Sequence, residues 1–235
     1  MKRFGTFYGG FTLPTNLEGL DKNSIVYSFG VGEDISFDII VAKQLGSDIH
    51  LFDPTPRAIQ HVDLIKRSFD SNIKPPYETK FGGGDKEYIN ILFNNKIQSS
   101  KIFMNGYGLY TENTTLKFYK PRNPNYVSHS LDMHMPNVNR NDYIEVEVKS
   151  LKTIMEERGH SKIDLLNVDI EGVEIEVLNQ MLDNNIQPKY LCVDFDKRRA
   201  NRDKDKFDNL INRLKSCGYK ILHSDNYDIS FKLEY

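Results

Sequence analysis

Three aspartates follow apolar runs of the sequence at points where strands are expected to end: Asp53, Asp169 and Asp194. In an open α/β sheet, ligands bind outside the carboxyl ends of the strands, so these three carboxylates should meet in one crevice. A single aspartate at such a place is commonly a helix cap or a turn residue, whereas three of them favour a ligand site. Carboxylates gathered there can accept hydrogen bonds from a ligand or remove a proton from it.

The stretch 26–38 should supply the other half of such a site. A run of β-forming residues is interrupted by Gly30 and Gly32, and apolar residues recur at helical spacing after Ser36. A strand, a glycine turn and a helix start direct backbone amides and a helix N-terminus into one crevice, as in nucleotide sites. We therefore predict a cradle for a nucleotide or a nucleotide-like cofactor.

The charges of the glycine turn help to choose the cofactor. Asp53 lies 21 residues after Gly32, a spacing at which an acidic residue accepts hydrogen bonds from ribose hydroxyls in both nicotinamide and S-adenosylmethionine sites. Ile35 stands where a dinucleotide fingerprint needs its third glycine, and Glu33 and Asp34 place negative charge where a pyrophosphate would lie. S-adenosylmethionine carries a sulfonium and an ammonium and no phosphate, so the turn favours it. An NAD-dependent oxidoreductase is the alternative.

The elements that must position these residues alternate between strands and helices, which predicts a parallel sheet with right-handed crossovers. Expected strands cover residues 25–30, 48–52, 101–106, 115–119, 143–149, 163–168, 190–193, 219–222 and 229–233. Expected helices cover residues 36–45, 57–69, 85–94, 150–158, 173–182 and 203–217. The last two strands should form an antiparallel pair.

One domain over residues 1–235 is expected, because no linker divides the chain. Residues 1–24 should be a strap packed on the sheet, with a lid or substrate lip as the alternative. The stretches 70–100 and 121–141 are rich in loop residues and should shape the acceptor side. The basic cluster at 197–204 is expected to be a solvated loop.

Composition narrows the classes of partner. Lys plus Arg total 31 and Asp plus Glu total 33, a formal charge of −2, so no nucleic-acid partner is expected. The sequence has no stretch near the ~20 apolar residues of a membrane span and no signal peptide, which predicts a cytoplasmic protein without a membrane partner. Of the two cysteines, Cys192 lies in an apolar run and should be a buried core thiol.

The runs 27–38 (YSFGVGEDISFD) and 163–174 (IDLLNVDIEGVE) resemble the two main signatures of FkbM-type S-adenosylmethionine-dependent methyltransferases. The stretches 107–109, 127–130 and 151–155 fall in the expected order, and the resemblance spans about residues 8–233. It implies a class I methyltransferase fold, Rossmann-like, with a seven-stranded mostly parallel sheet, helices on both faces and an antiparallel last strand. It also implies methyl transfer to a hydroxyl of a sugar, a glycan or a small natural product. A degenerate, non-catalytic glycan-binding module remains an alternative.

The resemblance also implies roles for individual residues. Cofactor contacts fall on Phe29, Gly30, Gly32, Asp34, Asp38, Asp53, Pro54, Thr55, Gly108, Leu109 and Asp169. Asp169 should face the acceptor and is the first candidate for the general base, followed by Glu171, His129 and His134.

The family often carries Glu-x-His at the end of the fifth strand, where this chain has Asp194-Phe195-Asp196. Because this chain lacks that histidine, a role as general base cannot be carried over from it. A divalent metal between Asp169 and Asp194 or Asp196 is an alternative that we do not favour, and we predict no metal ligands.

Overall fold

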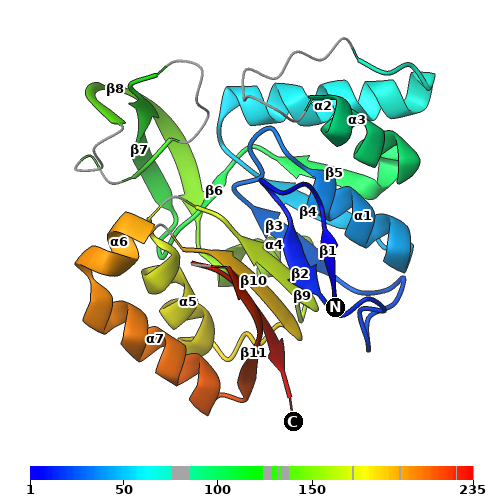
Figure 1. Cartoon of the computed structure of the whole chain (residues 1–235). Helices are drawn as coiled ribbons and strands as arrows, with labels where there is room; N and C mark the ends of the chain where they lie inside the picture. Colours follow the sequence, from blue (N-terminus) through cyan, green and yellow to red (C-terminus); the bar gives the residue numbers. More distant parts are fainter. Residues whose placement is uncertain are drawn as a thin grey trace.

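A seven-stranded mixed sheet forms the centre of the computed structural model, which describes residues 1–75, 85–123, 129–131, 133, 138–170, 172–195, 197–225 and 227–234 (Figure 1). The strand order is β11-β12-β10-β9-β3-β4-β5. These strands are β3 Val26–Phe29, β4 Ile49–Phe52, β5 Ile102–Asn105, β9 Leu165–Val168, β10 Tyr190–Asp194, β11 Tyr219–Asp225 and β12 Asp228–Leu233. β12 runs antiparallel to β10 and β11, and the pairs from β10 to β5 are parallel. The expected α/β fold and the closing antiparallel pair are confirmed.

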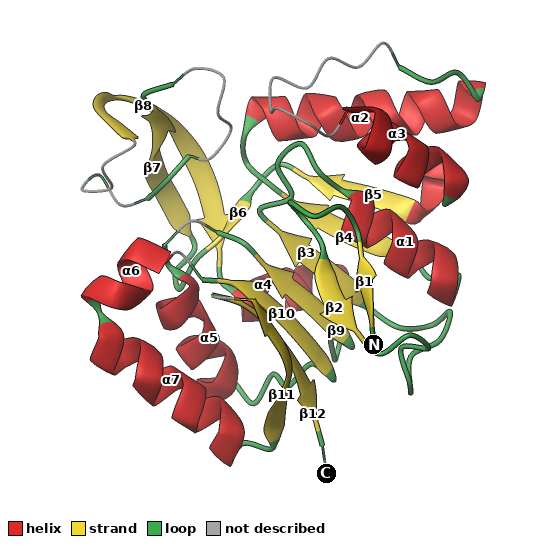
Figure 2. Ribbon diagram, viewed as in Figure 1, coloured by secondary structure: helices red, strands yellow, loops and turns green. Residues whose placement is uncertain are grey.

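Two hydrophobic clusters lie on the two faces of this sheet, because successive side chains of a strand point to opposite sides. One contains Tyr27 and Leu166 together with residues of α4 (Leu151–Arg158), α5 (Glu174–Asp183) and α7 (Lys204–Ser216). The other contains Val26 and Leu165 together with residues of α1 (Ser36–Leu45), α2 (Pro56–Ser71) and α3 (Asp85–Asn94). Helices therefore cover both faces, as Figure 2 shows.

Several of these helices begin or end at the residues that the sequence predicted. Gly46 follows α1 in the left-handed conformation, at φ 72°. The Ser150 side chain accepts a hydrogen bond from the Thr153 amide and so caps α4, which Gly159 ends. Cys192 is fully buried, as predicted.

A second, three-stranded sheet stands beside the first (Figure 1). It has the order β6-β8-β7, with β6 Gly108–Leu109, β7 Thr114–Pro121 and β8 Val138–Lys149. The prediction of an irregular loop over 121–141 is wrong at its C-terminal end, because β8 already begins at Val138, which pairs with Pro121. Residues 124–128, 132 and 134–137 of that loop lie outside the described residues.

The N-terminal strap is a hairpin of β1 (Lys2–Phe4) and β2 (Phe11–Leu13). Phe4 and Leu13 are fully buried in the cluster on the α1 side, so the two strands of the strap pack into that cluster. The tip of the hairpin is exposed, 84% at Phe7 and 71% at Tyr8.

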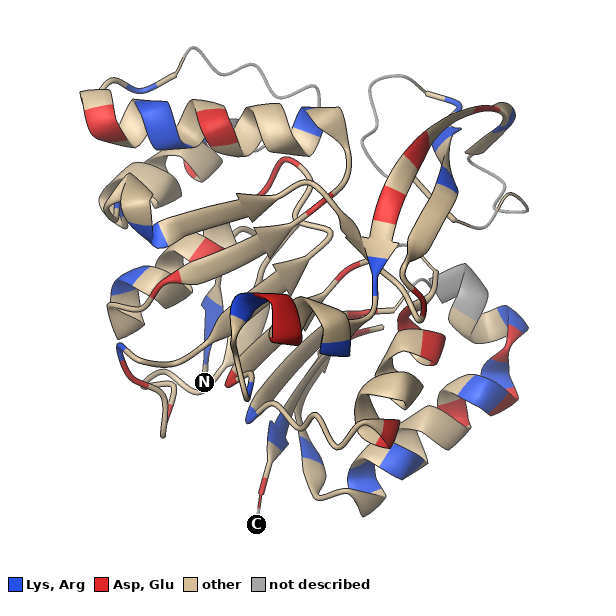
Figure 3. Cartoon of the chain, turned by 180° about the vertical axis from the view of Figure 1, so that it is seen from behind, with Lys and Arg blue, Asp and Glu red and all other residues tan. Residues whose placement is uncertain are grey.

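The basic cluster near the C-terminus is not a loop. It forms α6 (Lys197–Arg202), followed by α7, although for 197–199 and for 85 only the backbone is described. Figure 3 shows acidic and basic residues interspersed along the helices. None of the helices in the described ranges has the length and hydrophobicity that a bilayer-spanning segment needs.

Candidate functional site

The glycine turn after β3 passes directly against the end of β9. Gly30 adopts φ 76°, and its amide donates to the Phe52 carbonyl at 2.8 Å. A Cβ atom added at Gly30 would lie only 1.5 Å from the Asp169 carbonyl oxygen. Only glycine fits at this position, and its lack of a side chain allows the turn to lie against Asp169.

A cavity lies where the turn meets the carboxyl ends of the central strands; its empty volume, open solvent at the mouth included, is about 1020 Å³. Asp53, Asp169 and Asp194 all line it, so the predicted convergence of the three carboxylates is confirmed. Most of the predicted cofactor residues line it as well: Gly30, Gly32, Asp34, Asp38, Asp53, Pro54, Thr55, Gly108, Leu109 and Asp169.

Phe29, the remaining predicted cofactor residue, is not among the residues that line the cavity. Its side chain belongs to the cluster on the α4 side and stacks on Phe52 with ring centroids 4.3 Å apart. Phe52 does line the cavity, so Phe29 supports the site from behind.

Asp53 ties the glycine turn to the end of β4. The buried carboxylate accepts the Gly32 amide at 2.9 Å, the Thr55 amide at 2.8 Å and the Thr55 hydroxyl at 2.6 Å. Burial raises the pKa of Asp53, while these donors and the nearby His129 act to lower it. The carboxylate therefore shapes the turn, and its remaining lone pair can accept a ligand hydroxyl.

The acidic residues of the turn are held in different ways. Glu33 forms an ion pair with Arg57 at 2.7 Å, so its charge is compensated, contrary to the repulsion that the sequence suggested. Asp34 accepts the Thr6 hydroxyl at 2.5 Å and the Ser36 amide at 2.9 Å, which fastens the strap to the turn.

Asp38 is the most deeply placed acid of the site. Its carboxyl is hydrogen-bonded by the Ser28 hydroxyl, and it is 2% exposed. Burial, with a smaller contribution from Asp34, raises the pKa of Asp38 to about 7. The group can therefore change its charge near neutral pH.

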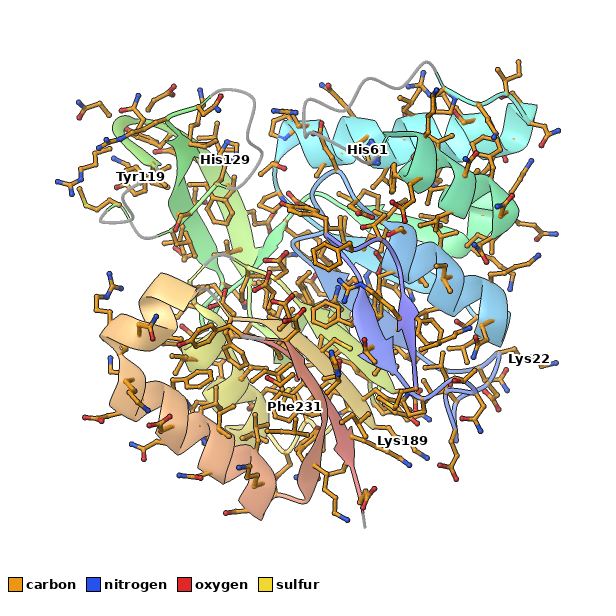
Figure 4. The ribbon with its side chains drawn as sticks, in the orientation of Figure 1. Lys22, His61, Tyr119, His129, Lys189 and Phe231 are labelled. Atoms are coloured by element: carbon orange, nitrogen blue, oxygen red, sulfur yellow. The ribbon has the colours of Figure 1, made fainter. Side chains whose placement is uncertain are left out.

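Two of the predicted bases can be placed. Asp169 lines the cavity, and its amide donates to the Phe29 carbonyl at 3.0 Å. His129 also lines the cavity, and Figure 4 shows it beside β7 and β8. Glu171 and His134 lie outside the described residues, as does Asp196 of the metal alternative. Among the described side chains, no group of three or more His, Cys, Asp or Glu is arranged to hold a metal ion.

The strap tip 8–11 lines the cavity, as the alternative of a substrate lip at residues 1–24 foresaw, whereas sequence reasoning missed Asn167 and Asp228 in the lining. Asn167 is 7% exposed, and its Oδ1 atom has no hydrogen-bond partner. An asparagine inside the apolar strand Leu165–Val168 was the signal that could have identified it. Asp228 lies directly opposite Asp194 in the β10–β12 register, which the sequence alone does not reveal.

The chain matches the family model described as the methyltransferase FkbM domain over residues 13–221, most of its length. The chain belongs to the FkbM methyltransferase family. The resemblance seen in the signatures 27–38 and 163–174 is thereby confirmed. The sequence has no match among curated proteins.

A solved structure shows a fold similar to that of this FkbM-family chain: the methyltransferase FkbM from Methylobacillus flagellatus KT, with 13% identity and a TM-score of 0.50. The match covers 94% of this chain and 46% of that one, so this chain spans about half the length of its relative. An rRNA methylase from Streptococcus thermophilus has 12% identity over 93% of this chain and 92% of its own, with a TM-score of 0.43, too low to carry an argument.

Proposed function

We propose that this chain is an S-adenosylmethionine-dependent O-methyltransferase. In this proposal, one methyltransferase domain of class I topology spans residues 1–235, and the acceptor is a hydroxyl of a sugar, a glycan or a small natural product. The acidic cavity is the observation that carries the proposal. Seven acidic residues line it; Arg57 compensates one of them, Glu33, and the described lining itself contains no lysine or arginine. Such a cavity suits a cationic donor and repels a pyrophosphate.

The residues present fit this donor. Asp53 and Thr55 would hold the ribose end, with Pro54, Gly108 and Leu109 beside the adenine. The Asn167 Oδ1 atom, which has no partner, and the Asp38 carboxyl would accept hydrogen bonds from the α-ammonium group. Gly30, which has no side chain, allows the turn to lie directly against the Asp169 carbonyl. When bound, the donor supplies an electrophilic methyl group on its sulfonium.

Asp169 is the proposed general base. Its carboxylate orients the acceptor hydroxyl and takes its proton as the new oxygen–carbon bond forms and the carbon–sulfur bond breaks. The products are a methyl ether and S-adenosylhomocysteine, and the proton rests on Asp169. Most of the rate comes from holding donor and acceptor in line. His129, which also lines the cavity, is the second candidate for the base.

Calorimetric titration with S-adenosylmethionine and, separately, with NAD tests the proposal. We expect one S-adenosylmethionine to bind per chain and NAD to give no saturable signal, because the acidic lining repels its pyrophosphate. Saturable binding of NAD, or a flat titration with S-adenosylmethionine, would contradict the proposed function.

A further inference from the structure

A second hollow lies on the face of the central sheet that carries α4, over the strands β4 and β5. Its empty volume, open solvent included, is about 720 Å³, and it is lined by His50, Tyr107, Glu157, Arg158 and His160. None of these described residues also lines the acidic cavity. The hollow is therefore a separate feature of the molecule, and its lining is rich in basic and aromatic side chains.

His50 is the buried member of this hollow. The residue is 7% exposed, and its ring stacks on Phe103 with centroids 5.0 Å apart and meets His160 edge-on at 4.9 Å. Its Nδ1 atom is buried and has no hydrogen-bond partner among the described residues. A buried polar atom without a partner costs stability, so a group that would complete it is expected. Phe103 is 39% exposed, so solvent and ligands can reach the ring from the side of β5.

Arg158 brings a positive charge that no carboxylate of the described residues compensates. Its guanidinium donates to the side-chain oxygen of Asn105 and lies over the Phe52 ring, 5.8 Å from the centroid. Its Nε atom is buried and, within the described structure, has no partner. A guanidinium stays protonated and donates through every nitrogen, so Nε is a donor that lacks an acceptor.

The one acid of the described lining is already compensated. Glu157 accepts two hydrogen bonds from the Lys149 ammonium, at 2.9 and 2.8 Å. Lys149 also contacts Glu147 at 3.3 Å, outside the lining. Glu157 therefore does not neutralise Arg158, and the positive charge of the guanidinium remains available to a ligand.

The two histidines respond to this positive charge. Burial, the largest cause, lowers the pKa of His50 to about 4, with smaller contributions from His160 and Arg158. Burial and Arg158 lower the pKa of His160 as well, and its Nδ1 atom is hydrogen-bonded to the Tyr27 hydroxyl at 2.7 Å. Both rings are therefore neutral at pH 7. An anion beside them would favour protonation, and a protonated imidazole donates from both ring nitrogens.

We propose that this hollow binds a phosphate group, held by the Arg158 Nε atom and the His50 ring. The inference goes beyond the proposed function and does not depend on it. The oxygens of a phosphate group point to four sides, so they can accept from β4 and from the end of α4 at once, whereas a carboxylate has two oxygens in one plane. Arginine is well suited to this role, because its planar donors match the oxygens of phosphate.

Titration calorimetry with inorganic phosphate, on the full chain in a chloride buffer at pH 7, tests the site. We expect saturable binding of phosphate by the wild type and at least tenfold weaker binding by Arg158→Gln and by His50→Phe. His50→Phe retains a ring that can stack on Phe103 and removes both nitrogens. Lys152→Gln is the control, because it removes an exposed positive charge from α4 outside the lining and should bind phosphate as the wild type does.

Urea unfolding without phosphate shows which variants fold and gives a second readout. His50→Phe removes a buried nitrogen that lacks a partner, so it should unfold at the same urea concentration as the wild type or a higher one, although it loses phosphate binding. A folded Arg158→Gln or His50→Phe chain that binds phosphate as tightly as the wild type overturns the inference. Equal weakening in Lys152→Gln also overturns it, because the effect would then be one of overall charge.

Glycerol 3-phosphate and acetate are the comparison ligands. Tighter binding of glycerol 3-phosphate than of inorganic phosphate would assign the group to a larger phosphorylated ligand, and weaker binding would assign the free ion; both results support the site. Acetate that binds as tightly as phosphate, or a wild-type chain without saturable phosphate binding, overturns the inference. Neither result bears on S-adenosylmethionine binding, so the failure of this inference and that of the proposed function are distinguishable.

Discussion

Replacing Gly30 with alanine probes the contact on which the site is built. The added Cβ would start 1.5 Å from the Asp169 carbonyl oxygen, and real Cβ atoms essentially never come closer than 3.0 Å to such an atom. The turn and the end of β9 would therefore have to separate by about 1.5 Å. That movement strains the hydrogen bond from the Asp169 amide to the Phe29 carbonyl, which is 3.0 Å long.

The magnitude follows from two terms. A residue with a side chain in the left-handed region costs about 1–2 kcal/mol relative to glycine. Loss of the strained hydrogen bond adds about 1 kcal/mol. We therefore expect Gly30→Ala to lower the free energy of unfolding by about 2–3 kcal/mol. Displacement of Asp169 by more than 1 Å should reduce methyl transfer about 100-fold.

Gly159→Ala is the matched control. Gly159 has φ 68°, close to the 76° of Gly30, but an added Cβ there has no atom within 4 Å. Gly159→Ala should therefore lower the free energy of unfolding only by the cost of the left-handed conformation, and it should leave methyl transfer unchanged. Urea unfolding and S-adenosylhomocysteine release measure the two quantities. If Gly30→Ala matches Gly159→Ala in both, the close approach of the turn to Asp169 does not organise the site.

Two further substitutions test single groups. Asp169→Asn should retain the fold and S-adenosylhomocysteine binding and lose most turnover, and near-normal turnover would exclude Asp169 as the base. Burial raises the pKa of Asp38 from 3.8 to about 7. Between these pH values the folded chain holds a proton on Asp38 that the unfolded chain has lost. The free energy of unfolding should therefore fall as the pH rises through this window. Asp38→Asn should remove a few kcal/mol of this fall between pH 4 and 8 in urea unfolding, and equal slopes for both proteins would show that Asp38 does not titrate as described.

The central strands and the cradle were predictable because local signals specify them. Continuous apolar runs identified the strands ending near Asp53, Asp169 and Asp194, and the parallel order implied that these residues meet. The glycine turn was visible for the same reason, since Gly30 and Gly32 interrupt a strand directly before a helix. Family membership then followed from two short signatures.

The parts that the sequence did not predict depend on contacts between distant segments. Arg57 compensates Glu33 across 24 residues, which changes the charge that the turn presents. Asp228 reaches the cavity only because β12 inserts between β10 and β11. The β7–β8 pairing was missed because polar residues at 138–141 resemble a loop, although they continue a strand exposed over most of its length.

A crystal structure of the chain with S-adenosylhomocysteine bound tests the central claim most directly. The account predicts the ligand in the cavity at the strand ends, with its ribose hydroxyls at Asp53, its α-amino group at Asn167 and Asp38, and its sulfur facing Asp169. A ligand bound elsewhere, or one whose ribose lies away from Asp53, would contradict the account.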